Sequence, residues 1–327
     1  MNKLLLIGFL LTSLLSCRES KNASTIKHEP YQIPSQLYNG RFFAKMLGPK
    51  NDTLVFMTDT GGGLFVLDSV LTAYGIPSEE REFDNQKGKI VQFTSLCNDE
   101  KFPKPNINGE QIMFSMPHGS PFLNFKTPEA GMLGQHWFKD QIWEFDYLKK
   151  KLTVGMPFHG SSTDSDVVKL GFVVDTFGKR EINFPRVQII VDSDTLDMLF
   201  DTGATVLLTD SARMQLQTSD KTRATSFIIG SIMDKWKKKH SDWRIITHAD
   251  QFPIKNGGLP DMIEVPSIKI GGHTVGPVWF TSRPDKNFTE WMSQWMDKKI
   301  VGAVGGSAFQ YFKITVDYPN ALAKFEQ

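Results

Sequence analysis

Short apolar stretches bounded by polar or turn-forming residues recur along the chain, and this pattern predicts β-strands rather than long helices. The first copy of the tripeptide Asp-Thr-Gly lies between two such stretches, and so does the second copy. A further stretch precedes each of two Asp-Tyr pairs. In chain order, these stretches are residues 54–57, 64–67, 142–145, 198–200, 206–208 and 314–316. The pattern predicts a mostly β fold made of two similar parts.

Each part also carries a glycine block with the same internal spacing. Counted from its first glycine, each block has Gly at +3, Phe at +7 and Asp-Tyr at +15 and +16. The matching residues are Gly131, Gly134, Phe138, Asp146 and Tyr147 in the first copy, and Gly302, Gly305, Phe309, Asp317 and Tyr318 in the second. Such self-similarity indicates a duplicated structural unit.

The two copies differ in the length of their middle section. Gly131 follows Asp59 by 72 residues, whereas Gly302 follows Asp201 by 101 residues, so an insertion is expected within residues 213–300. Nine residues after each aspartate comes Asp-Ser, at residues 68–69 and 210–211. These pairs are expected to N-cap a short helix in each copy.

Two copies, and no more, favour two lobes that face each other rather than a solenoid. The chain of 327 residues is also longer than one hydrophobic core usually serves. The turn-rich residues 155–168 separate the copies. We therefore expect an N-terminal lobe at residues 37–156 and a C-terminal lobe at residues 165–327.

The start of the chain predicts export and lipid anchoring. A basic start is followed by an apolar run at residues 4–15 and then by Leu14-Leu15-Ser16-Cys17, which resembles a bacterial lipobox. Residues 1–17 are therefore expected to be a lipoprotein signal peptide with Cys17 as the lipidated residue. A plain signal peptide or an uncleaved anchor is the alternative. The polar residues 18–36 are expected to be a tether, which would place the protein extracytoplasmically in a bacterial cell envelope, with the outer membrane favoured.

Charge and composition argue against several partners. Lys and Arg number 37 against 36 Asp and Glu, a net charge of +1 that gives no bulk attraction to nucleic acid. The seven histidines lack metal-ligand spacing, and residues 302–307 lack the lysine of a phosphate-binding loop, so neither a metal nor a cofactor is expected. Cys97 is expected to be a buried, inert thiol.

Two other segments have both a structural and a functional interpretation. The lysine-rich residues 235–240 are expected to form a solvated helix face, with contact to an anionic membrane surface as the alternative. Residues 287–299 are expected to form an amphipathic helix that packs on the second lobe, with lining of a substrate groove as the alternative.

The repeated Asp-Thr-Gly predicts a specific chemistry. Each copy puts one carboxylate at a tight turn, where glycine allows backbone N–H groups to approach it. If the two lobes bring Asp59 and Asp201 together, both cannot ionise, so the pair holds one proton and one negative charge. One carboxylate can then take a proton from a water while the other donates a proton to a carbonyl oxygen.

On these motifs the sequence resembles the aspartic peptidases, with two retropepsin-like halves in a pepsin-like arrangement. Met132-Leu133-Gly134 and Ala303-Val304-Gly305 match the hydrophobic-hydrophobic-Gly element of that family in place and order. The resemblance implies two β lobes with a central cleft and a peptide or protein substrate. It makes Asp59 and Asp201 the catalytic pair, supported by loop residues Thr60, Gly61, Thr202 and Gly203.

The sequence departs from the family at two points. Gly62 and Ala204 stand where many members have Ser or Thr, so neither side chain can donate to a carboxylate; retropepsin-like members carry Ala at this position. The family also covers its site with a hairpin, often tipped by an aromatic residue, for which Tyr74 and Phe83 are candidates in the first lobe.

Two other classes of protein compete with a peptidase. The first is a catalytically inactive, two-lobed peptide-binding or scaffold lipoprotein, which the pair Gly62-Gly63 favours because it loosens the first loop. The second is a carbohydrate-handling lipoprotein with paired carboxylates. The latter does not explain why both aspartates are followed by Thr-Gly and a downstream glycine block.

Overall fold

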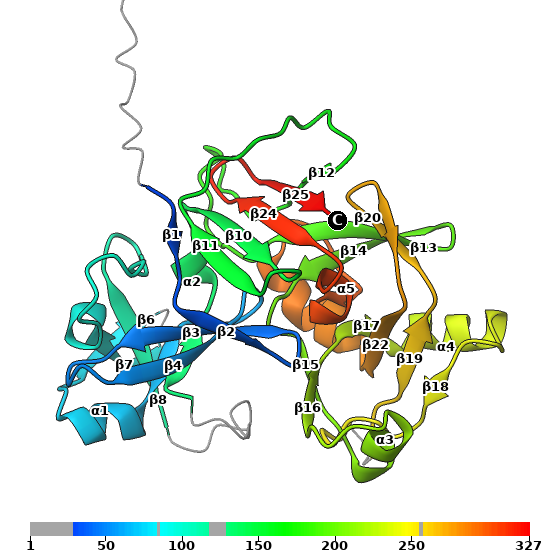
Figure 1. Cartoon of the computed structure of the whole chain (residues 1–327), viewed down its shortest axis with the longest axis horizontal. Coiled ribbons are helices and arrows are strands. Elements are labelled where there is room, and N and C mark those ends of the chain that lie inside the picture. Colours follow the sequence, from blue (N-terminus) through cyan, green and yellow to red (C-terminus); the bar gives the residue numbers. More distant parts are fainter. Residues whose placement is uncertain (1–28, 84–85, 118–128, 255–257) are drawn as a thin grey trace, which may run out of the picture.

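The computed structural model describes residues 29–83, 86–117, 129–254 and 258–327. Figure 1 shows them as two β lobes joined by a shared sheet. Cys17, the expected signal peptide and residues 18–28 lie outside the described residues. Within the described ranges, no helix has the length and apolar character needed to span a bilayer. The expected mostly β fold with two similar lobes is confirmed by the strand pairings.

The N-terminal lobe is built on an eight-stranded sheet with the order β2-β3-β4-β9-β5-β8-β7-β6. Its strands are β2 (Ser35–Tyr38), β3 (Arg41–Leu47), β4 (Thr53–Thr58), β5 (Phe65–Leu67), β6 (Glu79–Phe83), β7 (Gln86–Gln92), β8 (Ile112–Met116) and β9 (Gly131–Leu133). Its helical segments are α1 (Asp68–Tyr74), the 3-10 turn η1 (Phe93–Ser95) and α2 (Gln135–Phe138).

The C-terminal lobe is built on a nine-stranded sheet with the order β18-β19-β22-β17-β23-β14-β13-β20-β21. Its strands are β13 (Arg186–Val191), β14 (Asp194–Phe200), β17 (Ser226–Ile229), β18 (Ile245–Ile246), β19 (Met262–Val265), β20 (Ile268–Ile270), β21 (His273–Val275), β22 (Val278–Arg283) and β23 (Gly302–Val304). Its helical segments are α4 (Gly230–Lys239), η3 (Asn287–Trp291), η4 (Met292–Trp295) and α5 (Gly306–Phe309).

The two lobes repeat one pattern of strand pairing. In the N-terminal lobe, β9 pairs parallel with β4 and antiparallel with β5, and β5 pairs parallel with β8. In the C-terminal lobe, β23 pairs parallel with β14 and antiparallel with β17, and β17 pairs parallel with β22. In each lobe, the strand that ends at Asp-Thr-Gly therefore lies directly beside the strand of the glycine block.

The expected equivalence of residues 64–67 and 206–208 is wrong. Residues 64–67 lead into β5, whose counterpart by pairing is β17, not residues 206–208. Instead β15 (Thr205–Leu207) pairs with β16 (Thr222–Ala224) in a separate two-stranded sheet, with α3 (Asp210–Gln215) between them. Extra structure in the second copy thus begins directly after Asp-Thr-Gly, before the expected start at residue 213, because these apolar residues pack in a local cluster rather than in the main sheet.

The expected N-caps are also displaced by one residue. Asp68 and Asp210 are the first residues of α1 and α3, not the caps. Leu67 precedes α1 without a side-chain cap, whereas the side chain of Thr209 accepts a hydrogen bond from the N–H of Ala212. Both aspartates still lie in a first turn, where a negative charge interacts favourably with the helix dipole.

A six-stranded sheet with the order β1-β11-β10-β24-β25-β12 joins the lobes. Its strands are β1 (Tyr31–Gln32), β10 (Ile142–Asp146), β11 (Lys151–Val154), β12 (Val167–Lys169), β24 (Lys313–Asp317) and β25 (Leu322–Glu326). The two strands that end in Asp-Tyr, β10 and β24, pair antiparallel with each other from Ile142↔Asp317 to Asp146↔Lys313 (Figure 1). The duplicated halves are thus related by an approximate twofold at this strand pair.

The Asp-Tyr pairs have the same local role in both copies. Asp146 accepts a hydrogen bond from the N–H of Lys149 at 2.8 Å, which closes the turn after β10, and Asp317 does the same for Asn320 at 2.9 Å. The two tyrosines are buried and pack on the phenylalanine of a glycine block. The ring centroids are 6.2 Å apart for Tyr318 and Phe138, and 6.0 Å apart for Tyr147 and Phe309.

The end of the expected tether belongs to the folded part. Tyr31 pairs with Val154 in the joining sheet, and Ile33 is fully buried. The tether of residues 18–36 therefore ends before Tyr31, because this segment carries apolar side chains that fill the core. The expected turn-rich boundary of residues 155–168 includes the first two residues of β12, which returns to the same sheet beside β25.

The lysine-rich segment and the tryptophan pair have mainly structural surroundings. Three of the α4 lysines form ion pairs with aspartates of neighbouring elements, and Trp236 is 1% exposed. These ion pairs neutralise lysine charges that contact with an anionic membrane surface would need. In η3 and η4, Phe288 and Met292 are buried, whereas Trp291 and Trp295 are exposed by 66% and 42%. The segment packs on the second lobe, as expected, but as a π turn followed by a 3-10 turn.

Candidate active site

The two Asp-Thr-Gly loops meet at the interface between the lobes. The N–H of Thr60 donates to Thr202 Oγ1 at 3.1 Å, and the N–H of Thr202 donates to Thr60 Oγ1 at 3.0 Å. Each hydroxyl also donates across the interface, Thr60 to the carbonyl of Phe200 at 2.6 Å and Thr202 to the carbonyl of Thr58 at 3.5 Å. Both threonines are fully buried. They fix the two loops against each other.

Each aspartate is held by its own turn in the same way. The N–H of Gly61 donates to Asp59 Oδ1 at 2.9 Å, and the N–H of Gly203 donates to Asp201 Oδ1 at 3.0 Å. The N–H of each aspartate donates to the last residue of the glycine-block strand, at 3.0 Å for Asp59 and 2.9 Å for Asp201. The glycine block therefore sets the position of the loop.

The glycines also allow the two carboxyl groups to meet. A Cβ at Gly203 would lie 2.2 Å from Asp59 Cγ, and one at Gly61 would lie 2.8 Å from Asp201 Cγ. Real Cβ atoms do not approach other heavy atoms this closely, so only glycine fits at either position. The structure thus brings together all six residues that the sequence predicts for the site: Asp59, Thr60, Gly61, Asp201, Thr202 and Gly203.

Burial and proximity shift the pKa of both carboxyl groups. Burial, the negative charge of Asp59 and its hydrogen bond raise the pKa of Asp201 well above its usual value. Burial also raises the pKa of Asp59, but the hydrogen bond with Asp201, the N–H groups of Gly61 and Gly62 and the positive charge of Arg41 oppose this rise. The proton shared by the pair therefore resides mainly on Asp201, and the negative charge on Asp59.

Arg41 is a site residue that the sequence analysis missed. It begins β3 and is 1% exposed. Its guanidinium donates to Thr205 Oγ1 at 3.0 Å and to Thr222 Oγ1 at 2.9 Å, so it links the N-terminal lobe to both strands of the β15–β16 hairpin. Burial lowers the pKa of Arg41 to about 10, which still leaves it positively charged at neutral pH. A lone arginine after a turn has no sequence pattern that could have identified it.

The two departures from the family pattern have different local geometry. A Cβ at Gly62 would lie 2.6 Å from Asp59 Oδ2 and 2.5 Å from Met132 Sδ. Asp59 and Met132 therefore occupy the space that a serine side chain at position 62 would need. Ala204 fits its position, because its side chain is buried beside Gly305 of the second glycine block. In both loops, backbone N–H groups take the place of a side-chain donor.

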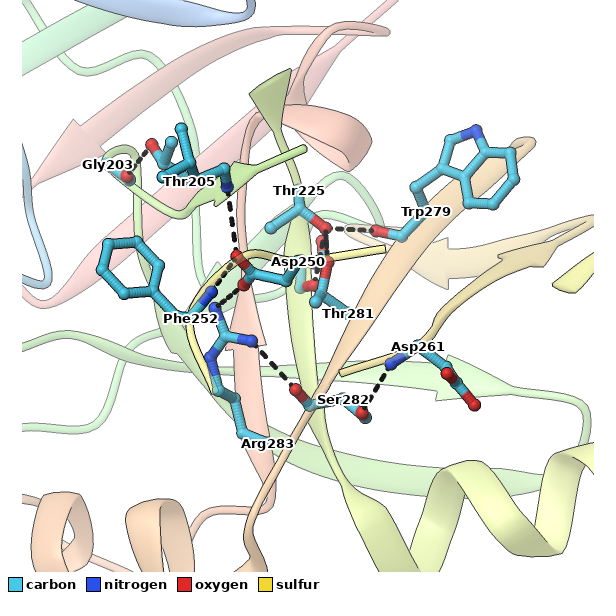
Figure 2. Close-up of polar contacts among 12 residues, drawn as sticks. Gly203, Thr205, Thr225, Asp250, Phe252, Asp261, Trp279, Thr281, Ser282 and Arg283 are labelled. Carbon is cyan, nitrogen blue, oxygen red and sulfur yellow. Dashed lines mark hydrogen bonds and ion pairs between the residues drawn. The ribbon is translucent and has the colours of Figure 1, made fainter. Parts of the chain in front are cut away.

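A buried ion pair stabilises the strand that follows the C-terminal Asp-Thr-Gly loop. Asp250 is fully buried and accepts from Arg283 at 2.7 Å, from the N–H of Leu207 at 3.3 Å and from that of Phe252 at 3.2 Å (Figure 2). Thr205 in turn donates to the carbonyl of Gly203 at 2.7 Å. This network, which the sequence analysis also missed, fixes the strand that follows Asp201.

A pocket of about 260 Å³ lies between the lobes next to these elements. The turn at Asn39 and Gly40 contributes to it from the N-terminal lobe, and Thr222, Arg223 and other residues contribute from the C-terminal lobe. The turn is tied across the interface, because the side chain of Asn39 donates to the carbonyl of Thr222 at 2.8 Å.

The hairpin expected to cover the site is only partly described. β6 and β7 form an antiparallel hairpin in which Phe83 pairs with Gln86, and its tip, residues 84–85, lies outside the described residues. Tyr74 is not part of a hairpin, because it ends α1 and its hydroxyl donates to Asp52. Cys97 is half-buried and donates to the carbonyl of Asp99 at 3.5 Å; burial raises the pKa of its thiol. In the described parts of the chain, no group of three His, Cys, Asp or Glu residues is arranged to hold a metal ion.

Two solved structures are similar to the chain over most of its length. The aspartic proteinase from Irpex lacteus is 10% identical, with a TM-score of 0.48, and the match covers 91% of this chain and 97% of that one. Conglutin gamma, a basic 7S globulin from lupine seeds, is 11% identical, with a TM-score of 0.46, and the match covers 91% of this chain and 95% of that one. Both TM-scores lie below 0.5, and it is the strand pairings of this chain that define its fold.

No protein-family model matches the chain, and no curated protein sequence does.

Proposed function

We propose that the protein is an aspartic endopeptidase that hydrolyses peptide bonds through a water held between Asp59 and Asp201. The observation that carries this proposal is the crossed pair of Thr60 and Thr202 hydrogen bonds, which holds the carboxyl groups of Asp59 and Asp201 within hydrogen-bonding reach of each other. Such a pair supplies one proton donor and one proton acceptor at the same point, which is what hydrolysis without a metal requires.

The asymmetry of the pair assigns the two roles. Asp59 bears the negative charge and takes a proton from the water, which attacks the carbonyl carbon of the scissile amide. Asp201, whose pKa burial and the Asp59 charge raise well above its usual value, donates its proton to the carbonyl oxygen. In the collapse of the tetrahedral intermediate, Asp59 gives its proton to the nitrogen, Asp201 accepts a proton from a hydroxyl of the intermediate, and the C–N bond breaks to release an amine and a carboxylic acid. The pair returns to one proton and one charge.

Single substitutions at the two aspartates test the proposal. Asp59→Asn and Asp201→Asn keep the shape of the site but remove the base or the acid, so each should lower kcat for an unstructured peptide pool by about 10³-fold or more. A statine-type transition-state mimic should inhibit the wild-type protein. Full turnover by Asp59→Asn would refute the proposal.

A catalytically inactive, peptide-binding protein is the second candidate. The observation that favours it is the absence of a side-chain donor at Gly62 and Ala204, where many peptidases of this kind have a hydroxyl. A wild-type protein that binds the statine-type mimic but cleaves no peptide would support this candidate over the first.

We further propose that the protein acts outside the cytoplasm of a bacterial cell and is anchored to a membrane, with the outer membrane favoured, through lipid on Cys17. The support is the lipobox-like sequence before this cysteine. Mass spectrometry of the purified protein should find a lipidated N-terminal cysteine, and Cys17→Ala should move the protein from the membrane fraction to the soluble fraction. Unmodified Cys17 in the membrane-associated protein would contradict this.

A further inference from the structure

Glu129 is a buried carboxylate that the proposed mechanism does not use. Its side chain lies in the N-terminal lobe and is 7% exposed. Neither carboxylate oxygen accepts a hydrogen bond in the described part of the chain. Burying a carboxylate without a partner is costly, and native proteins rarely keep such a group without a use. The group therefore points to a ligand.

Glu129 lies just before the strand that leads to the Asp59 loop. It comes two residues before β9, and β9 carries Met132, whose sulfur lies against the Asp59 loop. Met132 belongs to an apolar cluster with Phe43, Met57, Phe65 and Leu67. Arg41, which spans to the other lobe, lies close enough for its charge to act on Glu129 and on Asp59. Glu129 thus lies just before one end of β9, whose other end contacts the Asp59 loop, and the charge of Arg41 acts on both acidic groups.

The charges around this point favour a cation. With the aspartate pair holding one proton, the local charges are +1 on Arg41, −1 on the pair and −1 on ionised Glu129, so their sum is −1. The guanidinium of Arg41 donates to Thr205 and Thr222. A bound ammonium or guanidinium group would bring the sum to zero and supply the hydrogen-bond donors that the Glu129 oxygens lack.

We propose that Glu129 forms a subsite for a cationic group of the peptide substrate, either a Lys or Arg side chain or a free N-terminal amine. This inference rests on the proposed function, because it assigns a specificity to its substrate. Burial raises the pKa of Glu129 to about 7, with the positive charge of Arg41 opposing the rise, so the preference for a cation should strengthen from pH 5 to pH 8.

A positional scan with matched peptides tests the subsite by turnover. N-acetylated peptides carry either Lys or norleucine at each position around the scissile bond, and a third set carries norleucine with a free N-terminus. At pH 8 one Lys position, or the free amine, should raise kcat/KM about 10- to 100-fold over the neutral peptide. In the wild-type protein this preference should shrink at pH 5, where Glu129 is protonated. In Glu129→Gln it should be lost at both pH values. Glu100→Gln, at an exposed position of the same lobe, should keep the wild-type ratio.

A binding measurement separates this inference from the proposed function. Reduced-amide versions of the same peptides cannot be cleaved, and their Kd can be measured on the wild-type protein and on Glu129→Gln. A cation preference in binding without any cleavage would refute the peptidase but support the subsite. If the wild-type protein and Glu129→Gln both cleave the peptides at pH 8 and show the same ratio of kcat/KM for Lys over norleucine peptides, the subsite is refuted and the peptidase proposal is unaffected.

Discussion

The buried carboxylate of Glu129 should make the protein less stable as pH rises. The pKa of this group moves from 4.5 to about 7 on folding, so the folded state binds more protons than the unfolded state between these values. Stability is therefore lost as pH increases through this range and is not regained above it. At about 1.4 kcal/mol for each pKa unit, the full cost is about 3 kcal/mol above pH 7.

The substitution Glu129→Gln removes this cost without changing the shape of the side chain. Urea unfolding at pH 5 and pH 8 measures it, because the stability gap between variant and wild type should widen by about 2–3 kcal/mol between the two values. The exposed Glu100→Gln should change stability by less than about 0.5 kcal/mol at either pH. Parallel pH profiles for the wild type and Glu129→Gln would refute the reasoning.

Three further predictions concern the same lobe and the interface. Gly62→Ala should lower kcat of the proposed peptidase about tenfold or more, because its Cβ would lie 2.6 Å from Asp59 Oδ2, whereas Gly63→Ala, with open space around it, should keep wild-type kinetics. Thr60→Val should lower the free energy of unfolding by about 1–3 kcal/mol, and Thr60→Ser should restore it; equal melting temperatures for the two variants would contradict the role of the hydroxyl. Burial lowers the pKa of His136 to about 4, so protonating it favours unfolding. His136→Gln should reduce the loss of stability between pH 6.5 and pH 4, by up to about 3 kcal/mol, and an unchanged acid profile would count against this.

The two Asp-Thr-Gly loops could be predicted from sequence because their signals are local. The glycine of Asp-Thr-Gly is needed because the carboxyl group of the other loop lies so close to it. The glycine block must reach the same turn, and this requires its spacing. Both requirements therefore produce short sequence motifs. The duplication made the signal stronger, because each loop occurs with its own block. The structure places the loops of Asp59 and Asp201 together, as these motifs imply.

Other features could not be predicted from the sequence because they depend on long-range packing. Residues 206–208 are as apolar as a core strand, and only the pairing of β17 with β23 reveals that they belong elsewhere. Arg41 and Glu129 are single charged residues whose meaning comes from burial, and burial is decided by strands far away in sequence. The same holds for Asp250, whose partner Arg283 lies 33 residues away.

The sheet that joins the lobes determines when the site can exist during synthesis. One edge of strand β10 pairs with the neighbouring β11, but its other edge pairs with β24, which lies among the last strands of the chain, so that second edge stays open until nearly all of the polypeptide has left the ribosome. Closing so large a loop is slow compared with forming the local hairpins of either lobe. Until then the joining sheet does not hold the two lobes together, and a nascent or truncated chain would lack the aligned carboxyl pair that the proposed hydrolysis requires.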